Sequence, residues 1–139
     1  MSNAPAHVEK GLAGWKALLE TGDPSALDDV LAEDAVMISP VVFTPQRGKE
    51  ITKLYLAGAE QVLNNEHFRY VGEWLSESGA VLEFETKIGD IAVNGVDMIT
   101  FNADGKITEF KVMVRPLKAI NALHAAMGEM LERLKSGQA

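Results

Sequence analysis

The sequence of 139 residues contains no cysteine. A disulfide framework, a thiolate metal site and a cysteine nucleophile are therefore excluded, although this absence leaves the redox compartment open. Lysine and arginine form no cluster, and the net charge of −7 disfavours a nucleic-acid backbone as a partner. No apolar run approaches the roughly 20 residues that a bilayer-spanning helix needs. We therefore expect neither a nucleic-acid partner nor a membrane partner.

The start of the chain, Met1–Pro5, lacks the apolar stretch of a signal peptide, so we expect a cytoplasmic protein. His7, His67 and His124 are scattered along the sequence. No phosphate-binding loop, nucleotide fingerprint or zinc-ligand spacing accompanies them. We expect no metal and no cofactor.

The composition that remains, 47% hydrophobic and 24% charged residues, is typical of a globular chain. Its length predicts one domain over residues 1–139. Apolar spacing predicts helices at about 8–21, 24–33, 49–63 and 117–135, a short strand at 35–38, and consecutive strands from 68 to 115. Helices first and antiparallel strands afterwards indicate an α+β fold, with helices covering one face of the sheet.

The stretch Ile88–Arg115 predicts two successive hairpins. Asn94-Gly95 is the dipeptide that best suits a two-residue type I′ turn, and residues 102–105 suit a longer loop with a glycine. If Asn94-Gly95 forms the turn, Ala92 pairs with Asp97.

This pairing sorts the side chains onto two faces of the sheet. The apolar face carries Leu82, Phe84, Ile88, Asp90, Ala92, Asp97, Ile99 and Phe101, joined from the last strand by Phe110, Val112 and Val114. The register that matches apolar to apolar places Phe110 beside Asp97. Asp97 is thus predicted to point toward the hydrophobic side, with Asp90 diagonal to it.

A carboxyl among apolar side chains has a raised pKa, which suits a protonated acid or a proton shuttle. The alternative for Asp97 is a structural carboxylate held by Trp15 or Tyr55. Asp90 either shares a proton with Asp97 or lies exposed at the bend after Gly89.

The final helix, predicted over residues 117–135, repeats apolar residues at steps of three and four. It has to bury this stripe against its own sheet, against a second subunit, or against both. We therefore expect a homodimer.

Four short motifs occur along the chain: Glu20–Asp23, Leu31–Val36, Arg47-Gly48 and Val96–Ile107. With the order of predicted elements, they resemble the NTF2-like superfamily, and within it the SnoaL-like and ketosteroid-isomerase-like members. The resemblance implies a cone made of a curved mixed or antiparallel sheet, three N-terminal helices on its concave face and an added C-terminal helix. It also implies a conical pocket for a small, rather apolar molecule, and frequent dimers.

The resemblance assigns roles to individual residues. Asp97 falls on the family's oxyanion-hole aspartate, a carboxylic acid kept protonated so that it can donate a hydrogen bond. Trp15 falls on the tyrosine of the first helix that completes the hole, and Tyr55 on a supporting tyrosine. Ser39, which precedes Pro40, falls on the general-base aspartate. An unassisted serine cannot abstract a proton from carbon.

The expected function is therefore to bind, and to isomerise or otherwise transform, a small hydrophobic carbonyl or polycyclic ligand without a cofactor. Asp97 is the predicted catalytic group of this acid–base chemistry. The predicted pocket residues are Trp15, Ser39, Tyr55, Phe84, Asp90, Ile99, Phe110 and Val112. The alternative is a non-catalytic dimeric module whose pocket is filled by its own side chains. An open cavity favours the first function, and a cone plugged by aromatic rings favours the second.

Overall fold

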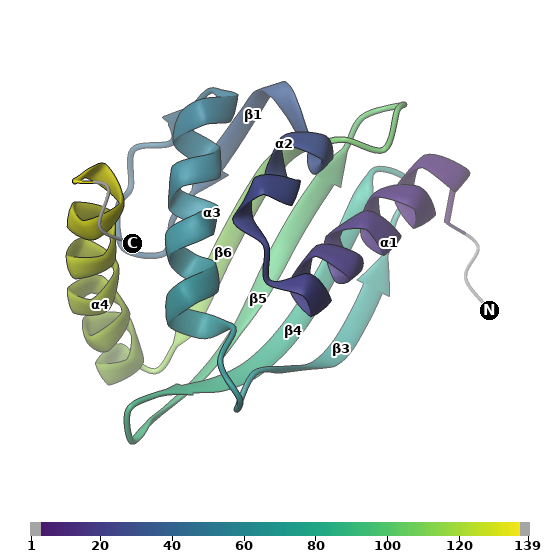
Figure 1. Ribbon diagram of the computed structural model, residues 1–139. Helices are drawn as coiled ribbons and strands as arrows, with labels where there is room; N and C mark the ends of the chain where they lie inside the picture. The colour runs from purple at the N-terminus through teal and green to yellow at the C-terminus, as the bar shows by residue number, and fades with distance from the viewer. Residues whose placement is uncertain (1–3, 137–139) are drawn as a thin grey trace.

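The computed structural model describes residues 4–136, so residues 1–3 and 137–139 of the predicted domain lie outside the described part. The elements, in chain order, are α1 (Ala6–Thr21), the 3₁₀ turn η1 (Pro24–Ala26), α2 (Leu27–Val30), β1 (Leu31–Ile38), β2 (Gln46–Arg47), α3 (Lys49–Leu63), β3 (Arg69–Leu75), β4 (Gly79–Ile88), β5 (Ile91–Phe101), β6 (Ile107–Arg115) and α4 (Leu117–Lys135). Figure 1 shows their arrangement.

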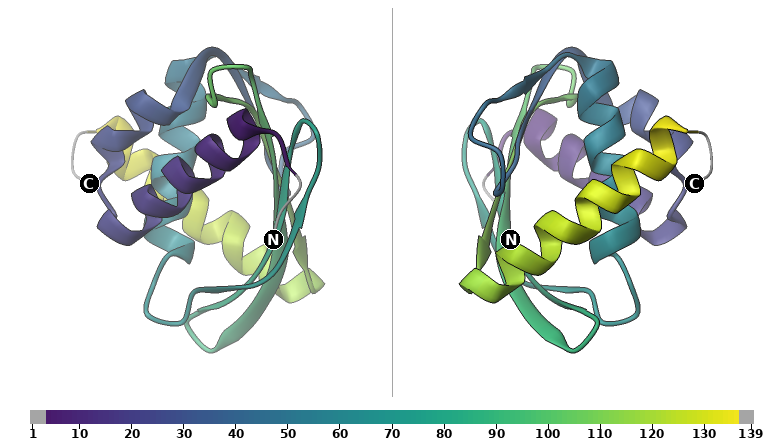
Figure 2. Two further views of the ribbon diagram at one scale, coloured as in Figure 1. Left: turned by 90° about the vertical axis from the view of Figure 1, so that its right-hand side faces the viewer. Right: turned by 90° about the vertical axis from the view of Figure 1, so that its left-hand side faces the viewer.

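The six strands form one sheet in the order β2-β1-β6-β5-β4-β3. The pair β1 and β6 is parallel, and the other neighbouring strands are antiparallel. Helices α1, α2 and α3 all lie on one face of the sheet, and the views from the side show the sheet curving around them (Figures 1 and 2). The α+β fold predicted from the sequence is confirmed.

Helix α1 lays its apolar stripe on the sheet. Its buried residues include Val8, Leu12 and Trp15. The helix ends at Gly22, which adopts a left-handed conformation with φ 66° and donates its N–H to the carbonyl of Leu18. This cap ends α1 after Thr21, and Trp15 lies within the helix with its ring buried against Phe110.

The hairpin between β4 and β5 turns at Gly89-Asp90, so the predicted turn at Asn94-Gly95 is wrong. Gly89 supplies the positive φ, 60°, that this turn uses. Gly95 instead lies inside β5 opposite Phe84, where a Cβ would come within 2.7 Å of the aromatic ring. The glycine at this position is required by the close approach of that ring.

The changed turn also changes the strand partners of Asp97. It pairs with Leu82 and Val112, rather than with Ala92 and Phe110 as predicted. The observed partner Leu82 and the predicted partner Ala92 are an even number of residues apart. Asp97 therefore lies on the predicted face of the sheet, although its partner differs. Asp97 points toward the helices, whereas Ala92 is exposed on the outer face.

The predicted second helix is shorter than expected. After η1, helix α2 ends at Val30, and β1 begins at once with Leu31, which pairs with Ile107 of β6. Leu31 is buried in the sheet, so tertiary packing overrides the helical spacing there. The predicted loop after β1 contains the short edge strand β2.

Helix α4 packs beside α3 (Figure 1). Its buried residues are Ala119, Leu123 and Met127, whereas His124 is exposed. The Met127 side chain lies close to Gly58 of α3. The stripe thus covers the helix's own domain. Although α4 has 19 residues, neither it nor any other helix within residues 4–136 is apolar enough to cross a membrane.

Candidate functional site

A cavity of about 40 Å³ lies between the helices and the sheet. It is lined by Trp15, Leu19, Leu56, Ala59, Glu60, Leu63, Asn64, Phe68, Tyr70, Phe84, Asp97, Phe110 and Val112. Helices α1 and α3 provide one wall, and strands β3 to β6 provide the other. Most of the lining is apolar, so the few polar groups decide what chemistry the cavity supports.

Three of these groups form a chain of hydrogen bonds across the cavity wall. The indole Nε1–H of Trp15 donates to the hydroxyl of Tyr70 at 2.8 Å, and that hydroxyl donates to Oδ2 of Asp97 at 2.6 Å. An indole can only donate, which fixes the direction of the chain. Within residues 4–136, the other oxygen of Asp97, Oδ1, accepts no hydrogen bond.

The surroundings of Asp97 alter its acidity. Asp97 is 7% exposed, and burial raises the pKa of its carboxyl to about 7, against the opposing effect of the Tyr70 hydrogen bond. The negative charge of Glu60 adds to the rise of this pKa. Burial and the charge of Asp97 raise the pKa of Tyr70, so the phenol stays protonated. Asp97 therefore changes between neutral and charged near pH 7.

Glu60 is a second carboxyl in the same cavity. Its Oε2 accepts a hydrogen bond from Nδ2 of Asn64 at 3.1 Å, while Oε1 is buried and has no partner among residues 4–136. Burial raises the pKa of Glu60, and the hydrogen bond from Asn64 opposes that rise. Within the described residues, no lysine or arginine lines the cavity, and no group of three His, Asp or Glu is placed to hold a metal ion.

Phe68 separates the cavity from the protein surface. It lines the cavity and also a polar surface groove of about 760 Å³. Its ring lies 5.1 Å from that of Tyr70 and 5.5 Å from that of Phe84, and it is partly exposed. Phe68 is thus the residue that the linings of the cavity and of the groove have in common.

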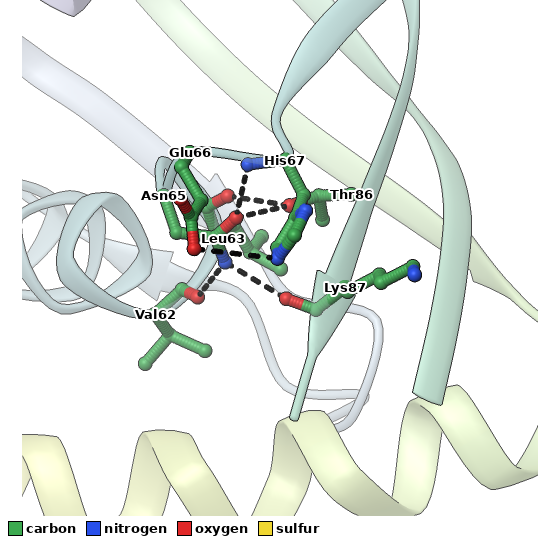
Figure 3. Close-up of polar contacts among 7 residues, drawn as sticks. All are labelled: Val62, Leu63, Asn65, Glu66, His67, Thr86 and Lys87. Atoms are coloured by element: carbon green, nitrogen blue, oxygen red, sulfur yellow. Dashed lines mark hydrogen bonds and ion pairs between the residues drawn. The ribbon is translucent and has the colours of Figure 1, made fainter. Parts of the chain in front are cut away.

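The backbone next to Phe68 is held by a network around Asn65 (Figure 3). The side chain of Asn65 donates to the carbonyl of Lys87 at 2.8 Å and accepts the N–H of His67 at 2.9 Å. Thr86 of β4 donates to the carbonyl of Leu63 at 2.9 Å. The connection between α3 and β3 is thus tied to β4, so a movement at this point would involve the Phe68 ring rather than the backbone.

Five of the predicted site residues line the cavity. They are Asp97, Trp15, Phe84, Phe110 and Val112. The rings of Trp15 and Phe110 are in contact at 4.8 Å. Trp15, Phe84 and Phe110 border the cavity of about 40 Å³ together with Asp97.

Four other predicted residues are not among the lining. Asp90 lies exposed in the turn between β4 and β5, which is the second of its two alternatives, so its predicted place in the pocket is wrong. The Ser39 hydroxyl, at the end of β1, accepts the N–H of Val41. Ile99 is buried between Ala80 and Phe110 in the sheet. Tyr55 is partly buried on α3 and packs against the core.

Glu60 was missed, although the sequence carries a signal for it. Leu56, Ala59 and Leu63 follow helical spacing on α3, and Glu60 interrupts this apolar stripe. A single carboxyl on the buried face of a helix is the pattern that would have identified it. The prediction had instead placed Tyr55 on that face.

Tyr70 was also missed, because simple alternation along β3 is broken by a bulge. Tyr70 pairs with Phe84, whereas Gly72 pairs with Glu83, so the strand gains one residue between them. Tyr70 therefore faces the cavity, while Trp74 faces outward and is 58% exposed. An alternating pattern would have placed both aromatic residues on one face.

The chain is similar in sequence and in structure to known proteins. A family model described as the SnoaL-like domain matches residues 12–110. A search of curated proteins found no match. A steroid delta-isomerase from Pseudomonas aeruginosa is 33% identical, with a TM-score of 0.91, over 98% of this chain and 99% of the other.

Two further solved structures are similar. A protein with a cystatin-like fold from Silicibacter pomeroyi is 32% identical, with a TM-score of 0.80, over 90% of each chain. An NTF2-like protein from Mesorhizobium loti shares the fold, with a TM-score of 0.61 and 17% identity over 81% of this chain and 96% of that one. The architecture with a curved sheet is common to all three.

Proposed function

This chain belongs to the SnoaL-like domain family, with the NTF2-like fold, and from that premise we propose that it binds a small apolar carbonyl compound in the cavity beside Asp97. In this proposal the neutral carboxyl of Asp97 donates a hydrogen bond to the carbonyl oxygen of the ligand. The reaction that such a contact assists is a proton transfer at the carbon next to the carbonyl, as in an isomerisation.

The observation that carries the proposal is the position of Asp97, a buried carboxyl with one hydrogen bond that lines an apolar cavity. Its Oδ2 already accepts the Tyr70 hydroxyl, so the proton of the neutral form sits on Oδ1, which has no partner of its own among residues 4–136. A donor fixed in a dry site stabilises negative charge that develops on an oxygen, at little cost of reorganisation. The raised pKa of Asp97, caused mainly by burial, keeps this donor protonated up to about pH 7.

The volume of about 40 Å³ limits the ligand. It exceeds what one water needs and is smaller than an aromatic ring requires. A ring-sized ligand therefore needs Phe68 to move aside, which would add the neighbouring groove. The proposal favours a small carbonyl compound over the polycyclic ligand that the sequence had left open. The steroid isomerase, 33% identical, supports the class of reaction.

Cyclopentanone is a small carbonyl probe of this site, although its five-membered ring also needs Phe68 to move aside. In a Trp74→Phe background, Trp15 is the remaining tryptophan, so its fluorescence reports on the cavity. We expect saturable binding that weakens as the pH rises through about 7, because the Asp97 donor is lost on ionisation. We expect about tenfold weaker binding in Asp97→Leu, the effect of one lost hydrogen bond.

The matched controls are Asp90→Asn, an exposed carboxyl change on the same hairpin, and cyclopentane, which has no hydrogen-bond acceptor. Asp90→Asn should bind cyclopentanone as the wild type does. Binding of cyclopentane should not weaken in Asp97→Leu. Equal affinity of wild type and Asp97→Leu for cyclopentanone would exclude Asp97 as the donor.

A second function, a non-catalytic module with a filled pocket, is favoured by the small volume of the cavity and by the Trp15–Phe110 contact. Phe68→Ala distinguishes the two. For a binding site, removing this ring should speed the association of cyclopentanone. For a filled module, the wild type should bind no ketone, and Phe68→Ala should lower the free energy of unfolding, with any ketone binding in the new cavity independent of Asp97.

A further inference from the structure

The unpartnered oxygen of Glu60 has no structural explanation. A buried polar atom without a hydrogen bond costs about 1–3 kcal/mol, and each such atom in a folded protein calls for a reason. Oε1 of Glu60 is the atom in question, and it belongs to a side chain that lines the cavity. A leucine or alanine would continue the apolar stripe of α3 without this cost.

Glu60 and Asp97 line the same cavity from opposite walls. Glu60 lies on the helical wall, Asp97 lies on the sheet wall, and the charge of Glu60 acts on Asp97. Among the described residues, Tyr70 is the other titratable group that lines this cavity, and the lining contains no lysine, arginine or histidine. Burial raises the pKa of Glu60, which strengthens it as a proton acceptor, while the Asn64 amide donates to Oε2, opposes that rise and leaves Oε1 free. The cavity therefore has an acid on one wall and a proton acceptor on the other.

We propose that Glu60 is the general base of this cavity, and that its Oε1 removes the proton from the carbon next to the carbonyl of the bound ligand. This inference rests on the function proposed above. The C–H proton moves to Oε1, the electron pair of the C–H bond forms a C=C bond, and the carbonyl π electrons move to oxygen. Asp97 donates to that oxygen. Return of a proton from Glu60 to carbon restores the carboxylate, so no other reactant is required.

Glu60 provides the general base for which the sequence offered only Ser39. Ser39 occupies the position of the family's base, and it lies at the end of β1 with its hydroxyl engaged by the Val41 N–H. Glu60 reaches the cavity from a different element, α3. A base within reach of the ligand contributes typically 10²–10⁴-fold to proton transfer.

The test is exchange of the α-protons of cyclopentanone in D₂O, followed by proton NMR, together with its binding to the same protein samples. We expect Glu60→Gln to bind the ketone and to lose about 100-fold or more of the exchange rate. The matched control is Glu132→Gln, an exposed carboxyl change on α4, which should exchange like the wild type. Binding by Glu60→Gln also establishes that this variant is folded.

The outcomes separate the two proposals. If the wild type binds the ketone, and Glu60→Gln exchanges it at the wild-type rate, Glu60 is not the base and the binding function stands. Binding without any exchange by the wild type overturns the role of Glu60 in the same way. If the wild type does not bind cyclopentanone, the proposed function fails, and this inference fails with it.

Discussion

At the scale of single residues, the inward direction of Asp97 could be predicted from the sequence, because alternation along a strand has a period of two. The error in the turn left that direction unchanged, since the strand partner moved by an even number of positions. The partner of the carboxyl could not be predicted. Tyr70 depends on a bulge in β3, and a bulge has no reliable signature in a single sequence.

The buried acid should make stability depend on pH. The carboxyl of Asp97 has a pKa of about 7 in the folded protein and about 3.8 when unfolded. Below pH 3.8 it is neutral in both states, whereas above 7 the fold contains a buried charge. We expect the free energy of unfolding to fall between pH 4 and 7 by on the order of 4 kcal/mol through Asp97. Urea unfolding over this range measures the fall.

Asp97→Asn should reduce this slope, because the amide does not ionise. Asp90→Asn should retain it, because Asp90 is exposed in the β4–β5 turn. The raised pKa of Glu60 acts in the same direction, so a smaller slope is expected to persist in Asp97→Asn. Parallel curves for the wild type and Asp97→Asn would contradict the assignment of the raised pKa to Asp97.

At the scale of elements, helices with strong periodicity and clear end signals were well predicted. Helix α3 begins at Lys49 and ends at Leu63, as predicted. The turn of the first hairpin was predicted at the wrong place, because both Gly89 and Gly95 lie where a turn is possible. Gly95 fits the stronger turn motif, but the ring of Phe84 occupies the space where its side chain would be. Such a requirement arises from tertiary packing, which the local sequence does not reveal.

The packing of α1 on the sheet gives a paired prediction. At Gly11, a Cβ would lie 2.2 Å from the ring of Phe101, whereas at Gly14 its nearest neighbour, in Val30, is 3.6 Å away. We expect Gly11→Ala to destabilise the fold by about 1–3 kcal/mol through overpacking. Gly14→Ala, its control on the same helix, should stabilise it by up to about 1 kcal/mol. Thermal and urea unfolding measure both changes. Similar effects of the two substitutions would contradict the described contact.

At the scale of the whole molecule, the homodimer expected from the sequence stays a prediction. Sedimentation velocity should give twice the mass of one chain. The stripe of α4 is engaged with α3, so Leu131→Lys should lower the free energy of unfolding by about 1–3 kcal/mol and leave the mass unchanged.

The control for this change is Glu132→Lys, next to it on the exposed side of α4, which should have little effect on stability. A loss of the dimer in Leu131→Lys, with stability intact, would show that the stripe serves association instead. If the wild type sediments with the mass of a single chain, the predicted homodimer is wrong.

The hydrogen bonds from Trp15 to Tyr70 and from Tyr70 to Asp97 limit how Asp97 exchanges its proton with solvent. An indole gives a hydrogen bond and takes none, so the route from Asp97 through Tyr70 comes to a dead end inside the protein. Among residues 4–136, these hydrogen bonds offer no route from Asp97 to the surface, so its proton would exchange by way of the cavity, where an occupant would block the exchange. While a ligand stays, Asp97 would keep its own hydrogen. Deuterium from the solvent would then arrive at the ligand from the partly exposed Glu60.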